Sequence, residues 1–331
     1  MLCKAPFNNI YFNTRGSASP CWKLPGYVDT WSADRSISDI WNGDKFQKYR
    51  DALRQDIFLK RCDSCKKEHD EGVWPLANAY EAYPINDNGY PSMLEIETSN
   101  KCNLECIMCS SELSSGLAKR DGVGLLEPYD DSFREQLKEF IPHLTELRFN
   151  GGEPFAQQMV LDICEDVSKI KPNLPISIAT NGTVMNKVVK HLMDVCTLHI
   201  NISIDSLIPE RYSKIRVNGN LEKVLKNLEV FKEYCNKYNR QLSIMVNPMR
   251  NNWEEMPLFL DLVNKHKCYL WFNTIMYPKQ LSLWNLPSSE LEHIHAKLNE
   301  MTHSRKGSYE WHKLDHLVNS QIKNWLLDSY V

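Results

Sequence analysis

The sequence lacks an excess of positive charge and any long apolar run. Its 39 Lys and Arg residues stand against 42 Asp and Glu residues, which gives a net charge of −3, so we expect no binding to nucleic acid. No stretch approaches the roughly 20 apolar residues of a membrane-spanning helix, and the N-terminus has no apolar signal-peptide core. We therefore expect a cytoplasmic protein that binds no membrane.

The cysteines do not indicate a disulfide framework. The 331 residues include 11 cysteines, an odd number, and the thiols of cytosolic proteins stay reduced. Cysteines at short spacing therefore indicate metal ligation. The isolated ones are expected to be buried, as small apolar side chains are. They are Cys164, Cys196, Cys235 and Cys268.

Short β-rich runs alternate with amphipathic helical stretches from about residue 93. The predicted strands are 93–98, 144–150, 175–181, 198–205, 241–247 and 269–276. The clearest helical periodicity between them is at 221–235. Six consecutive β-α units predict a parallel α/β structure, a partial (β/α)6 TIM barrel, with its chemistry at the C-terminal ends of the strands.

The flanking segments differ from this region in composition. Residues 1–90 are rich in aromatic and turn residues, hold four cysteines and show no β-α alternation. We therefore expect a small Cys-rich domain at 1–90, the partial barrel at 91–280 and a helical extension at 281–331. Pro287 should stand at a helix start there, and the histidines at 293–316 should lie on a solvated helix face.

Three cysteines follow the first predicted barrel strand without a histidine beside them. Cys102, Cys106 and Cys109 lie within eight positions. A structural zinc site would need a fourth ligand, and the next candidates, His143 and Cys164, lie in or beside predicted helices. Three thiolates suit a four-iron cluster that leaves one iron open.

The spacing C-x3-C-x2-C resembles the signature of the radical S-adenosylmethionine (SAM) family, and Gly151-Gly152-Glu153-Pro154 at the end of the second predicted strand resembles its GGEP motif. The glycines permit close approach of the backbone to a ligand. The resemblance implies a [4Fe–4S] cluster on the three cysteines, with SAM chelating the open iron. It also implies reductive cleavage of SAM and hydrogen abstraction from a substrate by the 5′-deoxyadenosyl radical.

The same resemblance implies further SAM contacts. Asn181 belongs to a Thr-Asn-Gly loop that closes the third strand, and Ser203 and Asp205, two apart on the fourth, should point to one side. Arg216 either pairs with the SAM carboxylate, which suits a guanidinium fork, or is a solvated helix charge. The implied SAM-binding residues are Gly151, Gly152, Glu153, Pro154, Asn181, Ser203, Asp205, Arg216 and Asn247.

The N-terminal segment holds a second cysteine pattern. Cys3, Cys21, Cys62 and Cys65 would, taken alone, most often indicate a zinc knuckle. The spacing from Gly16 to Cys21 and the run SISDIWNGDKFQKYR resemble the SPASM auxiliary-cluster domain in its shortened form, called twitch. The resemblance implies one auxiliary [4Fe–4S] cluster bound by all four cysteines. The domain precedes the barrel here, a permuted order compared with most relatives.

Two classes of function remain open. The first is a radical SAM oxidoreductase or maturase that acts on a C–H bond, with a peptide or protein side chain as lead substrate and the auxiliary cluster accepting an electron. A small-molecule sugar or aminocyclitol dehydrogenase or epimerase is the alternative within this class. The second class is a non-catalytic zinc-binding interaction protein. For the enzyme we expect an electron donor such as flavodoxin or ferredoxin, and the sequence indicates no catalytic acid or base.

Overall fold

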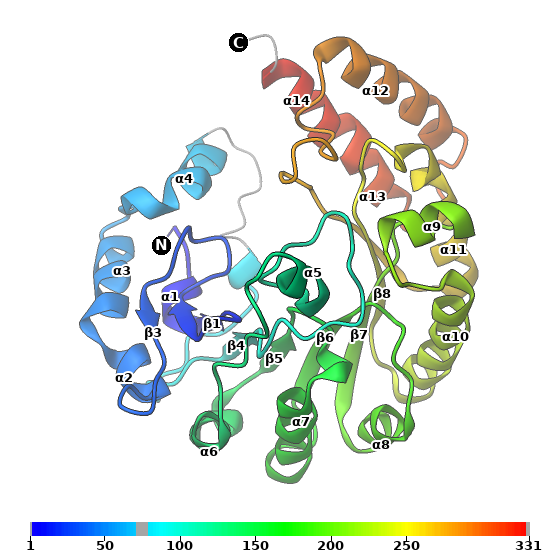
Figure 1. The fold of residues 1–331 in the computed structure, drawn as a ribbon. Coiled ribbons are helices and arrows are strands. Elements are labelled where there is room, and N and C mark those ends of the chain that lie inside the picture. The colour runs from blue at the N-terminus through cyan, green and yellow to red at the C-terminus, as the bar shows by residue number, and fades with distance from the viewer. Residues whose placement is uncertain (1, 71–78, 329–331) are drawn as a thin grey trace. The chain divides into compact units, whose positions relative to one another are not determined.

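The structure is a computed structural model that describes residues 2–70 and 79–328. The chain forms two compact units (Figure 1). The first contains residues 1–102, 111–179 and 186–198, and the second contains residues 103–110, 180–185 and 199–331. Residues 71–78 of the expected N-terminal domain and 329–331 of the expected C-terminal extension lie outside the described residues.

The first unit is an α/β structure whose strands follow the order β3-β2-β1-β4-β5-β6. Strands β1, β4, β5 and β6 are parallel, and β2 and β3 extend the sheet antiparallel at one edge. Its main elements are α1 (Ala5–Asn8), β1 (Asn9–Phe12), β2 (Ser17–Ser19), β3 (Asp29–Thr30), α2 (Ile37–Asn42), α3 (Asp44–Arg54), α4 (Asp63–Asp70), β4 (Met93–Ile96), α5 (Ser115–Arg120), α6 (Asp131–Phe140), β5 (Glu146–Phe149), α7 (Gln158–Ile170), β6 (Pro175–Thr180) and α8 (Lys187–Val195).

The second unit contains the parallel strands β7, β8 and β9 in that order. The helix expected at 221–235 is confirmed as α10; its N-cap Asn220 accepts a hydrogen bond from the Lys223 N–H. The main elements are β7 (Thr197–Ser203), α9 (Pro209–Ile215), α10 (Leu221–Tyr238), β8 (Leu242–Val246), α11 (Met256–His266), β9 (Tyr269–Phe272), α12 (Ser288–His303), α13 (Trp311–His316), a π-helical turn (Leu317–Ile322) and α14 (Lys323–Asp328).

All six predicted barrel strands are present, as β4 to β9, and the predicted parallel α/β architecture is confirmed. All six are shorter than predicted, and the largest difference is in β9, which ends at Phe272. Pro287 precedes α12, as expected. Within the described residues no helix has the length and apolar character that crossing a membrane requires.

The N-terminal segment contributes a strand to the parallel sheet, which the sequence did not indicate. Strand β1 pairs in parallel with β4, with Asn9 opposite Met93 and Phe12 opposite Ile96. The Phe12 side chain is fully buried, and its ring centroid lies 5.2 Å from that of Phe133 on α6. The Cys-rich segment and the first barrel strands therefore share one core.

A buried arginine on helix α3 contacts the start of the chain. The Arg50 guanidinium donates a hydrogen bond from Nε to the Pro6 carbonyl at 2.7 Å and lies 4.0 Å from the Trp41 ring centroid. Burial lowers the pKa of Arg50 to about 10. Since the ring face and the carbonyl both favour the cation, they offset part of this desolvation cost and hold α2 and α3 beside α1.

The shared core gives a first prediction. Replacement Phe12→Ala should lower the free energy of unfolding by about 3–5 kcal/mol, because it removes a fully buried aromatic ring. The control Tyr27→Ala removes a ring that is 57% exposed and should stay within about 0.5 kcal/mol of the parent. The measurement is urea denaturation of the anaerobic protein. A Phe12→Ala variant that melts only the N-terminal segment, in a separate early transition, would contradict the shared core.

Candidate active site

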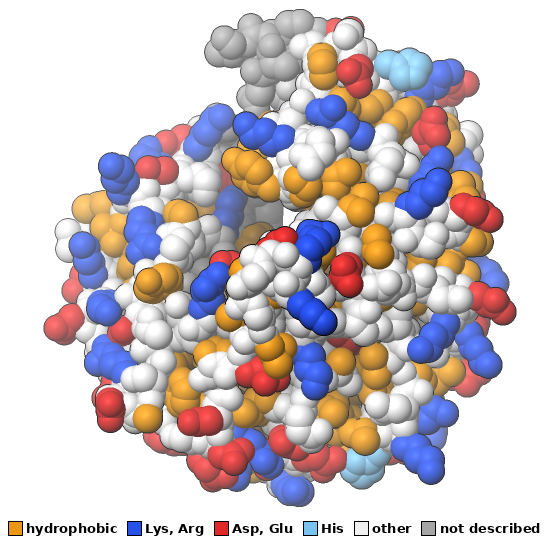
Figure 2. All heavy atoms as spheres, viewed as in Figure 1, with side chains coloured by type: hydrophobic (Ala, Val, Ile, Leu, Met, Phe, Trp, Pro, Cys, Tyr) orange, Lys and Arg blue, Asp and Glu red, His pale blue; other side chains and the backbone are white. Residues whose placement is uncertain are grey.

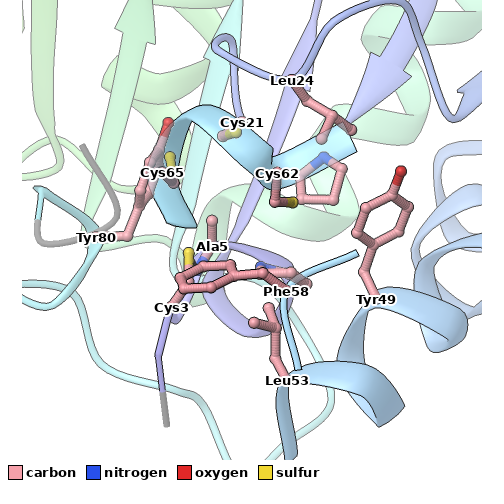
Figure 3. Close-up of a pocket in the computed structure, with 12 residues that line it drawn as sticks. Cys3, Ala5, Cys21, Leu24, Tyr49, Leu53, Phe58, Cys62, Cys65 and Tyr80 are labelled. Atoms are coloured by element: carbon pink, nitrogen blue, oxygen red, sulfur yellow. Dashed lines mark hydrogen bonds between the residues drawn. The ribbon is translucent and has the colours of Figure 1, made fainter. Parts of the chain in front are cut away.

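Four cysteines of the first unit line one pocket (Figure 3). Cys3 precedes α1, Cys21 follows β2, Cys62 ends a 3-10 turn (Lys60–Cys62) and Cys65 lies on α4. The remaining walls are mostly apolar or aromatic; these residues are Ala5, Pro6, Pro20, Leu24, Tyr49, Leu53, Phe58 and Tyr80. Segments up to 62 positions apart in the sequence thus bring four sulfur atoms around a largely apolar space.

The pocket keeps three of these thiols protonated when no metal is bound. Burial raises the pKa of Cys3 and of Cys21 to about 12, and burial together with the neighbouring Cys65 raises the pKa of Cys62 to about 11. A metal centre must supply the positive charge that replaces the thiol protons. Within residues 2–70 and 79–328, no three His, Cys, Asp or Glu side chains are close enough to share one metal ion. The four thiols surround a pocket instead, a donor set that fits a cluster with one cysteine on each iron.

The loop with the other three cysteines follows β4, and its first part belongs to the first unit. The Cys102 N–H donates to Ser115 Oγ at 3.2 Å, and the same hydroxyl donates to the Cys102 carbonyl at 3.1 Å. Two residues earlier, Asn100 Nδ2 donates to the carbonyls of Ser111 and Gly124. The backbone around Cys102 is therefore fixed by side chains, while its thiol remains partly exposed.

Cys106 and Cys109 belong to the second unit, where they form a tight turn. The Cys109 N–H donates to the Cys106 carbonyl at 3.0 Å. The Ile107 N–H donates to the Ile215 carbonyl at 2.9 Å, so the cysteine turn is tied to the end of α9. Both thiols are partly exposed. The loop as a whole offers three thiols, a donor set that fits a cluster with one open iron.

The two glycines of the GGEP motif are required by close packing in the first unit. Gly151 and Gly152 have φ values of +72° and +52°, where side chains are disfavoured. A Cβ atom on Gly152 would lie 2.4 Å from the Lys101 carbonyl oxygen. The Glu153 N–H donates to that same carbonyl at 2.9 Å. The motif therefore packs directly against the backbone that leads into Cys102.

Glu153 and Pro154 follow the two glycines in this turn. Both side chains are buried, and Glu153 accepts a hydrogen bond from the Phe155 N–H at 3.2 Å. Pro154 opens a short 3-10 turn. Gln157 adds three hydrogen bonds from its amide nitrogen to nearby carbonyls, one of them to Lys101 at 3.2 Å. These hydrogen bonds fix the backbone before Cys102.

Asp205 and Arg216 form a buried ion pair in the second unit. Arg216 Nη2 lies 2.6 Å from Asp205 Oδ2, and the side chains are 7% and 0% exposed. Burial alone would lower the pKa of Arg216, but Asp205 and Cys106 hold it above its usual value. Arg216 Nη1 also lies 4.0 Å from Cys106 Sγ. Arg216 is therefore not a solvated helix charge, and that alternative is wrong.

The sequence predicted Ser203 and Asp205 on one strand, but only Ser203 belongs to β7. Ser203 ends β7 and is half-buried, whereas Asp205 lies beyond the strand, so alternation along the strand does not set its direction. Asp205 Oδ1 accepts hydrogen bonds from the Asn247 N–H at 2.7 Å and from Asn247 Nδ2 at 2.9 Å. The carboxylate thus joins the ends of β7 and β8.

Asn181 supports the cysteine loop from the end of β6. Its Nδ2 donates to Asn103 Oδ1 at 2.9 Å, and Asn103 Nδ2 donates to Thr183 Oγ1 at 2.8 Å. Asn103 directly follows Cys102 in the sequence. Among the SAM-binding candidates of the second unit, Asp205, Arg216 and Asn247 are therefore brought together, and Asn181 contacts the cysteine loop instead.

A half-buried acidic residue at the end of β4 was missed from the sequence. Tyr11 on β1 donates its hydroxyl to Glu97 Oε2 at 2.8 Å, and a Cβ on Gly151 would lie 2.7 Å from the Glu97 Cβ. Burial raises the pKa of Glu97 to about 7; the Tyr11 hydrogen bond lowers it, and the charges of Glu95 and Glu112 raise it. The sequence signal was the alternation of Glu95 and Glu97 with apolar residues.

The buried ion pair gives a second prediction. Replacement Asp205→Asn should lower the free energy of unfolding by about 3–5 kcal/mol, because it leaves the buried Arg216 charge without a partner. The control Asp194→Asn changes an exposed carboxylate and should have little effect. Adding Arg216→Met to Asp205→Asn should recover part of the loss, since no buried charge then remains. Additive losses in the double variant would show that the two residues are not coupled.

The third prediction concerns pH. Because the pKa of Glu97 is raised, the folded chain binds more protons than the unfolded chain between about pH 4.3 and about 7. Stability should therefore fall as pH rises through this window. Replacement Glu97→Gln should flatten the profile of urea midpoint against pH. The control Glu233→Gln, at an exposed carboxylate, should keep the slope of the parent, and an equal slope in all three proteins would contradict the assignment.

Two protein families match the chain. Residues 96–263, about half of the chain, match the radical SAM superfamily, and residues 3–66 match SPASM, an iron-sulfur cluster-binding domain. A GTP 3′,8-cyclase of Clostridium botulinum (strain Hall) is 25% identical over 55% of this chain and 56% of its own. The Molybdenum cofactor biosynthesis protein moc-5 of Caenorhabditis elegans is 28% identical over 60% of this chain and 31% of its own. The match thus spans about half the length of the first of these relatives and less of the second.

Solved structures of low sequence identity also resemble the chain. Streptococcus suis SuiB bound to S-adenosylmethionine has a TM-score of 0.48 and 13% identity over 79% of this chain and 58% of its own. Native anSMEcpe with bound AdoMet has a TM-score of 0.49 and 19% identity over 64% of this chain and 61% of its own. With the family matches, the parallel strands confirm the expected partial barrel with an auxiliary-cluster domain. The chain belongs to the radical SAM superfamily, with a SAM-binding [4Fe–4S] cluster and, in its N-terminal SPASM domain, an auxiliary iron–sulfur cluster.

Proposed function

We propose that the protein is a radical SAM oxidoreductase that oxidises a C–H bond of a peptide or protein side chain. The observation that carries this proposal is the pocket with four cysteines, present in addition to the three-cysteine loop. A cluster bound by four thiolates has no open iron for SAM, so it suits electron transfer. A second redox centre supports net oxidation of the substrate.

The residues of the two sites have separate roles in this proposal. Cys102, Cys106 and Cys109 hold the SAM-binding cluster, and Cys3, Cys21, Cys62 and Cys65 hold the auxiliary cluster. The first cluster with bound SAM supplies, on reduction, a 5′-deoxyadenosyl radical that abstracts hydrogen from the substrate. The proposed domains are the auxiliary domain at 1–90, the barrel at 91–280 and the helical extension at 281–331.

The proposed SAM site uses the turns and strand ends described above. The GGEP turn supplies backbone groups for the SAM amino group, at the backbone that leads into Cys102. Arg216 lies 4.0 Å from Cys106 Sγ, and its guanidinium stabilises the Cys106 thiolate and orients the SAM carboxylate. Asp205 acts through Arg216 and Asn247, as a positioning residue. The proposed SAM-binding residues are Gly151, Gly152, Glu153, Pro154, Asn181, Ser203, Asp205, Arg216 and Asn247.

The second candidate function is cyclisation of a purine nucleotide. It is supported by the curated relatives, several of which are named GTP 3′,8-cyclase. A sugar or aminocyclitol is a further small-molecule alternative. The peptide proposal is supported by the resemblance of the N-terminal domain to the SPASM domains of peptide maturases. A flavodoxin or ferredoxin is the proposed electron donor for each of these reactions.

One isotope experiment separates these substrates. The anaerobically reconstituted enzyme is incubated with SAM, dithionite and one of three deuterated substrates. These are proteins and peptides from cells grown on deuterated amino acids, deuterated GTP, or deuterated sugars. The measurement is deuterium in 5′-deoxyadenosine by mass spectrometry. We expect deuterium from the peptide fraction. Transfer from GTP or from sugars alone would replace the peptide proposal with the corresponding small-molecule function.

The fourth prediction separates the roles of the two clusters. The double variant Cys62→Ala with Cys65→Ala should keep about four irons per chain and still form 5′-deoxyadenosine with dithionite. It should form no oxidised product, because the substrate radical has no internal electron acceptor. The control Cys235→Ala with Cys268→Ala removes two buried cysteines outside both sites and should keep about eight irons and full turnover.

Iron content and circular dichroism check that the Cys62 and Cys65 variant is folded, since losing a metal site can unfold a small domain. A folded double variant that makes product at the parental rate would show that the auxiliary cluster does not accept the electron. Zinc in place of iron in the parent protein would overturn the enzyme proposal itself.

A further inference from the structure

A basic groove lies beside the cysteine pocket in the first unit. Four of its seven lining residues are cationic, and none is acidic. They come from the β2–β3 loop, from α3 and from the turn before α4, and they are Val28, Lys45, Lys48, Tyr49, Leu59, Lys60 and Arg61. The whole chain carries a net charge of −3, so this concentration of positive charge is local. Figure 2 shows several Lys and Arg side chains over α3 and α4, with Asp and Glu side chains between them.

Two of the four cations already have partners. Lys45 Nζ lies 3.0 Å from Asp29 Oδ1. The Arg61 guanidinium donates hydrogen bonds to the Pro25 carbonyl at 2.9 Å and to the Tyr27 carbonyl at 3.0 Å, both of which leave its charge uncompensated. The groove therefore has a fixed guanidinium at one wall.

The other two cations are exposed and available. Lys48 lies on α3 and Lys60 opens the 3-10 turn before α4. Neither has an ion-pair partner among the residues that the structure describes. Leu59, Tyr49 and Val28 are the apolar part of the lining. A lining that combines apolar and cationic side chains suits a protein partner with acidic side chains.

The groove and the cysteine pocket share a wall. Tyr49 lines both, and Arg61 is the residue before Cys62. Figure 3 shows Cys62 on the side of the pocket that faces Tyr49. A partner seated in the groove would therefore be separated from the proposed cluster ligands by one side chain.

We infer that the basic groove docks a small acidic one-electron carrier protein, which takes up the electron that the auxiliary cluster has received. The inference rests on the proposed function. In each event the reduced auxiliary cluster loses one electron, and the flavin or iron–sulfur centre of the oxidised carrier gains it. No atom or proton is transferred. Transient redox complexes bury little area and depend on charge to steer association, which matches an open groove with exposed lysines.

Binding to an acidic flavodoxin tests the groove directly. The variant Lys48→Glu with Lys60→Glu should raise the dissociation constant at low salt by roughly tenfold or more. It should also weaken the dependence of this constant on salt concentration. The control Lys187→Glu with Lys190→Glu changes net charge equally at two exposed lysines of α8 and should bind like the parent. Carbodiimide coupling should link flavodoxin carboxylates to Lys45, Lys48 or Lys60.

The result that would overturn the inference is equal flavodoxin affinity in the parent and the groove variant, or cross-links confined to other surfaces. Inorganic pyrophosphate is titrated as a third probe. Saturable pyrophosphate binding that is lost in the groove variant, with flavodoxin binding retained, would instead identify a small-anion site and also overturn the inference. If the double variant loses iron, flavodoxin affinity is compared between the parent and the single variant Lys48→Glu. Lys48 lies on α3 rather than in the turn that carries Cys62.

A failure of this inference and a failure of the proposed function give different results. The groove variant should form 5′-deoxyadenosine with dithionite at the parental rate, because dithionite does not need the groove. A failure of the deuterium experiment would change the substrate without changing flavodoxin affinity. A failure of flavodoxin binding would leave the substrate and the role of the auxiliary cluster as proposed.

Discussion

The buried carboxylate of Asp205 is the contact on which the geometry of the second unit depends. One oxygen pairs with Arg216 at 2.6 Å, and the other accepts two hydrogen bonds from Asn247. The backbone carbonyl of Asp205 accepts a hydrogen bond from Asn252 Nδ2 at 2.7 Å. A buried charge is stable only when such partners surround it. The ends of β7 and β8 and the segment after α9 are therefore fixed together, and with them the turn of Cys106.

The first unit gathers its thiols in a pocket with mostly apolar walls, where burial outweighs the charge that Arg61 exerts on Cys62. Burial keeps Cys3, Cys21 and Cys62 protonated in the free protein. Binding a cluster must release these protons and couples cluster affinity to folding. Because β1 pairs with β4, the stability of the cysteine pocket and that of the barrel strands are linked. An N-terminal auxiliary domain is therefore built into the sheet rather than attached by a linker.

The sequence predicted those features that leave a local pattern. Six barrel strands follow from β-rich runs between amphipathic helices, and the candidate ligands follow from cysteine spacing. It could not predict β1, because this four-residue strand pairs with a segment 84 positions away. It also left open whether Arg216 is solvated, since helical position alone does not reveal the buried Asp205. The Tyr11–Glu97 contact was missed for the same reason: alternation shows a shared face but not the partner on the next strand.

Strand β4 leads from the four-cysteine pocket to the loop that begins with Cys102. Met93, at its start, packs with Cys3 and Cys21, while Cys102 follows its end. From the first to the last of its four residues the strand spans roughly 10 Å, at about 3.3 Å per step. Between these ends, Glu95 accepts a hydrogen bond from Tyr80, which itself lines the cysteine pocket. Burial raises the pKa of Glu95, and Arg148, whose Nη1 lies 3.9 Å from Glu95 Oε2, opposes this shift. A buried carboxyl with an arginine beside it therefore lies on the strand that leads from the four-cysteine pocket towards Cys102.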